Sequence, residues 1–133
     1  SQGGLVLVNA LGRHVLAEMY VCDPRALDDV ETVRDIMVGA AIKAGAEVRE
    51  VAFHKFNPQG VSGVVVISES HLAVHTWPEF GYAAVDVFTC GDKVDPWDAV
   101  NAIADSFRSK QVTASEIKRG VIIDVGKERV AAG

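Results

Sequence analysis

Cysteine is scarce in this chain. The 133 residues include only two, Cys22 and Cys90, and neither belongs to a closely spaced pair of the kind that binds structural zinc. Two distant thiols make no disulfide framework, so we expect a reducing, cytoplasmic setting. Cys22 reads as an inert, buried thiol, which is the usual state of a free cysteine.

Long apolar runs and an excess of basic charge are also missing. No stretch approaches the roughly 18 apolar residues of a membrane-spanning helix, and the start of the chain lacks the charged segment of a signal peptide. The formal net charge is −5, which argues against a basic patch for nucleic acid. We therefore expect neither a membrane nor a nucleic acid as a partner.

Apolar residues, in contrast, are plentiful. They make up 49% of the chain, which is enough for a modest hydrophobic core. The sequence contains no internal repeat, linker or low-complexity segment. Its length and uniform composition predict a single domain spanning residues 1–133.

Two helices are predicted by apolar residues that recur at steps of three and four. The first covers residues 27–44, with Asp28 or Asp29 as its N-cap and Gly45 as a left-handed end. The second opens with Asp95 as its cap, followed by a proline that fits the first turn.

The remaining segments read as strands. Alternating or continuous apolar residues predict strands over 13–21, 47–56, 61–69, 71–76, 82–89, 111–118 and, as a further possibility, 120–125. The third of these is continuously apolar, which indicates burial on both faces and a central place. The order predicts an α+β two-layer sandwich, with a largely antiparallel sheet carrying two helices on one face. The other face would then be free for a partner.

Reactive side chains gather in residues 61–91. An apolar run leads into Ser68-Glu69-Ser70-His71, His75-Thr76-Trp77-Pro78-Glu79 follows, and a second apolar run ends at Cys90-Gly91. Hydroxyl, carboxylate, imidazole and thiol groups thus collect around the ends of two predicted strands. These are the side chains used for nucleophilic attack and proton transfer.

This block resembles the signature of the small prokaryotic S-adenosylmethionine decarboxylases. The matching segments run from Ile67 to Leu72, His75 to Glu79, Gly81 to Ala84 and Phe88 to Gly91, and weaker matches extend over nearly the whole chain. The resemblance implies a self-processing, pyruvoyl-dependent lyase. Its product would be the aminopropyl donor for polyamine synthesis, including that of spermidine.

The resemblance gives the central role to Ser70. Its hydroxyl would attack the carbonyl of Glu69, and the resulting ester would break by β-elimination into a β chain, 1–69, and an α chain, 70–133. A hydroxyl beside its own peptide carbonyl is a nucleophile that needs only orientation. The pyruvoyl group left at residue 70 would bind the substrate amine as a Schiff base. It would serve as the electron sink in place of pyridoxal phosphate, and no metal would be needed.

The resemblance also assigns five supporting residues. His75 would be the base of the processing step, and Cys90 the acid that protonates the carbanion after decarboxylation. Ser62 would assist processing, for instance by hydrogen-bonding the reacting carbonyl. Phe56 would stack on adenine, reaching in from the other protomer of a homodimer whose sites lie near the interface. Glu79 would accept hydrogen bonds from the ribose hydroxyls.

Strand geometry makes one demand on this site. Ser70 and His75 are an odd number of residues apart, so a regular strand would point them to opposite faces. We therefore expect a turn or bulge between Glu69 and His71 if both serve one site. His71 and His75 do share a face, which leaves a loose metal-binding alternative with Cys90.

Two further hypotheses stay open. The same chemistry could act on a free amino acid such as arginine or ornithine, although Phe56 and Glu79 favour an adenosyl substrate. The chain could instead be a non-processing homologue that binds a ligand, although Ser70, His75 and Cys90 are all in place. No role is assigned to His14, His54 or Asp86.

Overall fold

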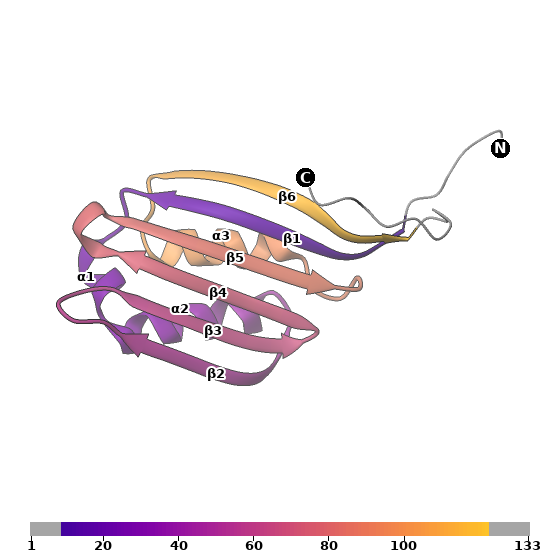
Figure 1. Ribbon diagram of the computed structural model, residues 1–133, viewed down its shortest axis with the longest axis horizontal. Helices are drawn as coiled ribbons and strands as arrows, with labels where there is room; N and C mark the ends of the chain where they lie inside the picture. Colours follow the sequence, from indigo (N-terminus) through magenta and orange to yellow (C-terminus); the bar gives the residue numbers. More distant parts are fainter. Residues whose placement is uncertain (1–8, 123–133) are drawn as a thin grey trace, which may run out of the picture.

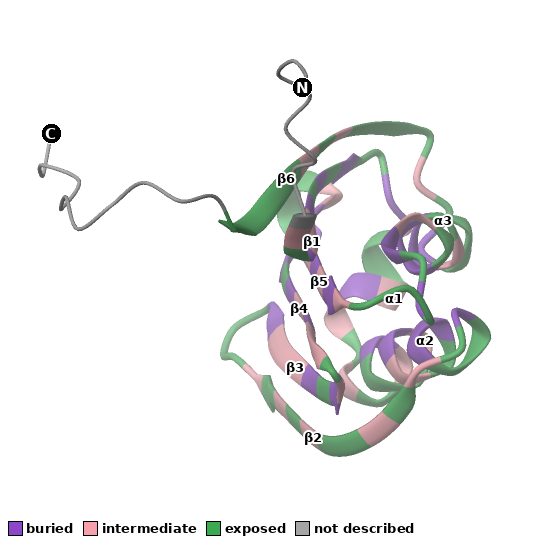
Figure 2. Cartoon of the chain, turned by 90° about the vertical axis from the view of Figure 1, so that its right-hand side faces the viewer, coloured by how far each residue is buried: buried purple, intermediate pink, exposed green. Residues whose placement is uncertain are grey.

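Six antiparallel strands form one sheet, and the helices cover only one of its faces (Figures 1 and 2). The computed structural model describes residues 9–122. Along the sheet the strands are ordered β2-β3-β4-β5-β1-β6. Their bounds are β1 Asn9–Tyr20, β2 Glu47–Lys55, β3 Val61–Ser68, β4 Ser70–Trp77, β5 Tyr82–Cys90 and β6 Gln111–Ile122. The predicted α+β two-layer sandwich is confirmed.

The helical segments begin and end at capping residues. They are α1 Pro24–Asp28, α2 Val30–Lys43, the 3-10 turn η1 Pro78–Phe80, and α3 Pro96–Ser106. The helix predicted over 27–44 begins too early, because Asp29 is extended (φ −104°, ψ 112°) and separates α1 from α2; Asp29, one of the two predicted caps, is the N-cap of α2. Its carboxylate accepts a hydrogen bond from the Thr32 N–H at 3.1 Å, which starts α2 afresh. Asp95 caps α3 as predicted.

The hydrophobic core lies between the sheet and the two longer helices. Its fully buried side chains come from both layers and include Val15, Val33, Met37, Val65, Leu72, Val85, Ile103 and Phe107. Burying a side chain of this size stabilises the fold by about 1.5–3 kcal/mol. Cys22 belongs to this core as predicted, and burial raises the pKa of its thiol.

Two strands differ from the prediction at their ends. β1 begins at Asn9 rather than at residue 13. β6 is continuous through residues 111–122 instead of dividing near residue 119, because Gly120 adopts φ 68° and pairing with β1 continues beyond it. Residues 123–125, assigned to a further strand, lie outside the described part of the chain.

The second face of the sheet, here called the open face, carries no helix within residues 9–122 (Figure 2). The prediction that β3 is buried on both faces is therefore wrong for the single chain, since Val66 is 39% exposed. Other apolar side chains that project from the strands are also 38–45% exposed: Leu16, Tyr20, Trp77 and Ile117.

None of the helices within residues 9–122 has the length and apolar character that a membrane span requires.

Candidate active site

Ser70 begins β4 immediately after a two-residue turn. Ile67 and Ser70 pair across Ser68-Glu69. Two-residue turns usually place glycine or asparagine at positive φ, but here Ser70 itself has φ 125°. Backbone strain of this kind costs of the order of 1–3 kcal/mol in a residue other than glycine. The irregularity expected between Glu69 and His71 is present, and it lies at the predicted cleavage point.

The carbonyl before Ser70 is already polarised. Its oxygen, on Glu69, accepts a hydrogen bond from the Cys90 N–H at 3.2 Å. A backbone donor in this position can stabilise the negative charge that develops on the oxygen during nucleophilic attack. Cys90 ends β5, pairs with Gly12 of β1 and carries a free, half-buried thiol.

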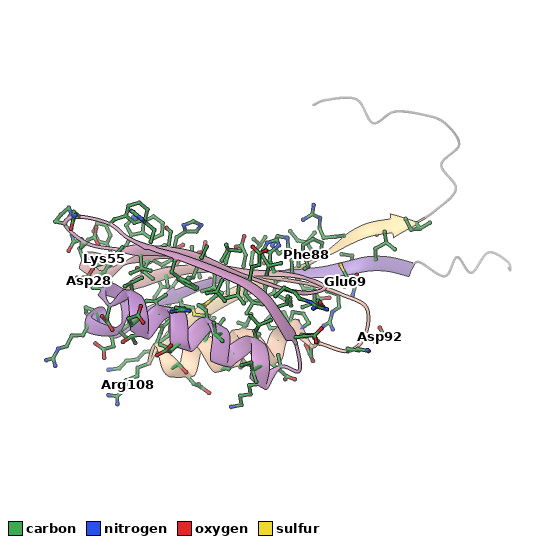
Figure 3. The ribbon with its side chains drawn as sticks, turned by 90° about the horizontal axis from the view of Figure 1, so that it is seen from below. Asp28, Lys55, Glu69, Phe88, Asp92 and Arg108 are labelled. Carbon is green, nitrogen blue, oxygen red and sulfur yellow. The ribbon has the colours of Figure 1, made fainter. Side chains whose placement is uncertain are left out.

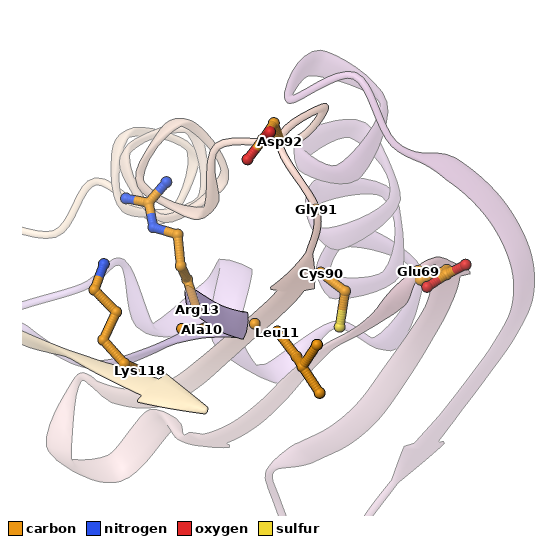
Figure 4. Close-up of a pocket in the computed structure, with 9 residues that line it drawn as sticks. Ala10, Leu11, Arg13, Glu69, Cys90, Gly91, Asp92 and Lys118 are labelled. Atoms are coloured by element: carbon orange, nitrogen blue, oxygen red, sulfur yellow. The ribbon is translucent and has the colours of Figure 1, made fainter. Parts of the chain in front are cut away.

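A cavity of about 900 Å³ opens beside this carbonyl (Figure 4). Glu69 and Cys90 line one side of it, and Arg13 and Lys118 line another. Both cations also contact Glu116, each at 2.9 Å. We call Glu69, Ser70 and Cys90 the nucleophile half-site.

A second group of predicted residues lies elsewhere on the sheet. Ser62 Oγ and His75 Nδ1 are 2.8 Å apart on paired positions of β3 and β4. Phe56 and Glu79 line a smaller cavity, about 310 Å³, together with Ser62 and His75. We call Ser62 and His75, with Phe56 and Glu79, the base half-site.

The two half-sites lie near opposite ends of β4. Ser70 and His75 are five residues apart on one strand, which separates them by about 17 Å at 3.4 Å per residue. Figure 3 shows the same two ends, with Glu69 at one and Lys55, next to Phe56, at the other. The irregularity at Ser70 thus does not bring Ser70 and His75 together within one chain. Ser62 is likewise paired with His75 rather than with the Glu69 carbonyl.

The metal-binding alternative fails on the same geometry. His71 and His75 are four residues apart on β4, or about 14 Å, which is too far for two ligands of one ion. Within residues 9–122, no three histidine, cysteine or acidic side chains are grouped so that they could hold a metal.

Sequence reasoning missed several polar groups around Ser70. Thr89 is the β5 partner of Ser70, and its Oγ1 is buried without a hydrogen-bond partner among the described residues. His14 accepts a hydrogen bond at Nδ1 from Arg119 Nη1 at 3.0 Å, and its Nε2 lies 3.7 Å from Asp86. Strand alternation alone would have put His14 and Asp86 on the open face.

The pairing of Ser62 with His75 did have a signal in the sequence. A two-residue turn pairs residues at equal distances on either side of it. Ser62 precedes Ser68 by as many residues as His75 follows Glu69. Placing the turn at Ser68-Glu69 would therefore have predicted both this pair and its distance from Ser70.

Comparisons with known proteins agree with this geometry. The family model for S-adenosylmethionine decarboxylase matches residues 13–120. An S-adenosylmethionine decarboxylase proenzyme of Caldanaerobacter subterraneus subsp. tengcongensis is 75% identical over 114 residues, covering 86% of this chain and 92% of the relative. One of Carboxydothermus hydrogenoformans is 69% identical over 117 residues, covering 88% and 92%.

A solved structure gives the same result. The crystal structure of the adenosylmethionine decarboxylase from Aquifex aeolicus VF5 superposes with a TM-score of 0.82 at 34% identity. The match covers 90% of this chain and 99% of that one. The chain therefore belongs to the S-adenosylmethionine decarboxylase family.

Proposed function

We propose that this chain is a proenzyme that cuts itself between Glu69 and Ser70 and then decarboxylates S-adenosylmethionine. One observation carries the proposal: Ser70 is held at φ 125° directly after a carbonyl that accepts the Cys90 N–H. The names of the relatives support both the precursor state and the substrate. The product would be the aminopropyl donor for polyamine synthesis, and free cysteines fit a cytoplasmic enzyme.

Processing would proceed in two stages on the chain's own atoms. Ser70 Oγ attacks the Glu69 carbonyl carbon, the Cys90 N–H holds the oxygen, and the peptide bond is exchanged for an ester. A base then removes the α-proton of Ser70, and the Glu69 carboxylate leaves from its β-carbon. This elimination separates the 1–69 and 70–133 chains. Water then hydrolyses the dehydroalanine left at position 70, which releases ammonia and leaves the pyruvoyl group.

The residues around position 70 fit a pyruvoyl group built into the chain. Residue 70 would carry its carbonyl on this strained backbone, directly after Glu69, which lines the neighbouring cavity together with Cys90. Such a ketone supplies the electron sink that pyridoxal phosphate supplies elsewhere. Cys90 would protonate the substrate carbon after carbon dioxide leaves.

A homodimer would unite the two half-sites. A twofold axis makes each contact between protomers reciprocal. An axis that passes through the middle of β4 on the open face would bring the base half-site of one protomer to the nucleophile half-site of the other. The half-exposed apolar side chains of that face, such as Leu16, Val66 and Ile117, suit burial against a second copy. Ser62 and His75 would then act on the partner's Ser70.

The adenosyl part of the substrate would be bound by the base half-site. The ring of Phe56 is 44% exposed and free to stack on adenine. Glu79 lines the same small cavity and can accept two hydrogen bonds from ribose hydroxyls. These contacts favour S-adenosylmethionine over arginine or ornithine, which have no nucleoside.

The mass of the purified protein under denaturing, reducing conditions tests the proposal. We expect two fragments that meet at Glu69 and Ser70, with the 70–133 fragment blocked at its amino end. Ser70→Ala should give one intact chain, because alanine has no nucleophile. Decarboxylation of S-adenosylmethionine, compared with arginine and ornithine, then tests the substrate. A wild-type chain that stays intact on long incubation would refute processing and favour a ligand-binding homologue.

A further inference from the structure

The first stage of processing needs a proton acceptor that the base half-site does not supply from the same chain. When Ser70 Oγ attacks, its proton must leave, and the nitrogen of the broken peptide bond must gain one. His75 of the same chain is about 17 Å away along β4. An imidazole close to Ser70 would be suited to both transfers.

His71 provides that imidazole. Its Nδ1 lies 3.5 Å from Ser70 Oγ, and within residues 9–122 its ring has no other hydrogen-bond partner. Nδ1 can accept the hydroxyl proton when the ring carries its own proton on Nε2. A catalytic hydrogen bond is often long before the reacting state forms, so 3.5 Å suits a group poised for transfer.

The His71 ring is held by aromatic neighbours. It packs edge-on against Phe88, with ring centroids 5.8 Å apart, and against His14 at 6.2 Å. Phe88 in turn fits against Gly12, where a Cβ atom would come within 2.5 Å of the ring. These contacts restrict the tilt of the imidazole and keep Nδ1 directed at the start of β4.

The neighbouring His14 is not suited to accept this proton. Arg119 donates to its Nδ1, so the ring proton of neutral His14 resides on Nε2, which faces Asp86 at 3.7 Å. Neither nitrogen is therefore free to accept a proton from Ser70. Among the described histidines near the turn, His71 alone combines contact with Ser70 and a free acceptor nitrogen.

We propose that His71 is the catalytic base and acid of the first processing stage. Nδ1 takes the Ser70 hydroxyl proton as the bond from Oγ to the Glu69 carbonyl carbon forms. The peptide C–N bond then breaks, and His71 returns the proton to the Ser70 nitrogen. Because the product is an isomer of the starting chain, no co-reactant is needed. The inference rests on the proposed self-cleavage and divides it between two histidines.

Because His71 and His75 act in different stages, ester formation and elimination can be tested separately. Hydroxylamine cleaves an ester but leaves an ordinary peptide bond intact, so it reports ester formation independently of elimination. We expect His71→Phe, which keeps the ring packing on Phe88, and His71→Gln to form the ester at least about 100-fold more slowly, the usual scale for losing a proton-transfer group. His75→Ala should form the ester normally and accumulate it.

The measurement is the fraction of each purified chain cut at Glu69-Ser70, by mass, with and without hydroxylamine. His54→Phe serves as a matched control, since His54 is also a strand histidine packed on an aromatic ring, that of Phe56, with centroids 4.6 Å apart. The control should be cut at the wild-type rate.

Three results would overturn the assignment. His71→Phe or His71→Gln cut at the wild-type rate would show that the imidazole is not needed. A hydroxylamine-sensitive ester that accumulates in either variant would place His71 in the elimination stage instead. A wild-type chain that is neither cut nor sensitive to hydroxylamine would refute the self-cleavage itself. This outcome differs from a failure of the His71 assignment alone, in which the wild-type chain is still cut.

Discussion

At the scale of single residues, the proposed reactive residue, Ser70, is distinguished by its backbone conformation as well as by its hydroxyl group. Ser70 occupies a φ of 125° that glycine would adopt without cost. The family resemblance assigned the reaction to Ser70, and strand geometry predicted the irregularity that the structure shows there. The sequence could not predict the Cys90 N–H on the Glu69 carbonyl, because a backbone donor has no side-chain signature.

The strain at Ser70 predicts an unusual order of stabilities. Neither Ser70→Gly nor Ser70→Ala can process, so both remain single chains. We expect the glycine variant to be more stable by about 1 kcal/mol, because it adopts positive φ freely while alanine does not. Urea unfolding at one protein concentration measures the difference. At an unstrained position, the alanine variant would be at least as stable, because glycine loses more conformational entropy on folding. Finding that order here would show that Ser70 is not strained.

At the scale of elements, β6 is attached to the rest of the fold by a partly buried ionic cluster. Glu116 on β6 accepts hydrogen bonds from Arg13 on β1 at 2.9 and 3.1 Å, from Trp97 Nε1 on α3 at 2.7 Å, and from Lys118 at 2.9 Å. These donors, Arg13 foremost, hold the pKa of Glu116 well below its usual range. The cluster joins the edge strand to both layers.

Glu116 therefore makes stability depend on pH. Since its pKa is lowered on folding, its contribution is present above the unfolded pKa of about 4.3 and is lost as pH falls further. In the uncut Ser70→Ala background, Glu116→Gln should destabilise the chain by about 1 kcal/mol near pH 7, discounted for partial exposure.

The stability difference between the chain that keeps Glu116 and the Glu116→Gln variant should shrink on acidification. Unfolding measured at neutral pH and at about pH 3.5, below the unfolded pKa, checks this. Glu31→Gln is a suitable control, because Glu31 is 71% exposed and only weakly paired with Arg34 at 3.9 Å. A Glu116→Gln penalty of the same size at both pH values would contradict the role given to the ionised carboxylate.

Element boundaries also show where sequence reasoning succeeds and fails. Caps and left-handed glycines predicted the ends of α2 and the start of α3, because each acts through a local hydrogen bond or torsion. The sequence offered Asp29 as one of two caps but did not predict the short helix α1 that precedes it. β6 was divided near Gly120 because its continuation depends on pairing with β1, a contact between distant parts of the chain.

At the scale of the whole molecule, the predicted site residues lie in two separate places on the sheet. One chain carries a nucleophile half-site and a base half-site about 17 Å apart on β4, and an open apolar sheet face between them. Residue types alone suggested a single site, because sequence proximity placed Ser70 and His75 close together. An extended strand turns five residues of sequence into a distance of about 17 Å, which the proposed homodimer would span.

Co-expression of Ser70→Ala and His75→Ala chains with different affinity tags tests the central claim most directly. Successive purification on the two tags isolates the mixed dimer. One of its two sites lacks both Ser70 and His75, and the other site keeps both. The intact site pairs Ser70 of the His75→Ala chain with His75 of its partner. The measurement is the mass of the His75→Ala chain.

We predict that the His75→Ala chain stays whole by itself but is cut between Glu69 and Ser70 in the mixed dimer. A partner carrying both substitutions is the control, and it should leave the His75→Ala chain uncut. If that chain stays whole beside Ser70→Ala, or is cut by itself, then His75 does not act across the dimer and the divided site is wrong.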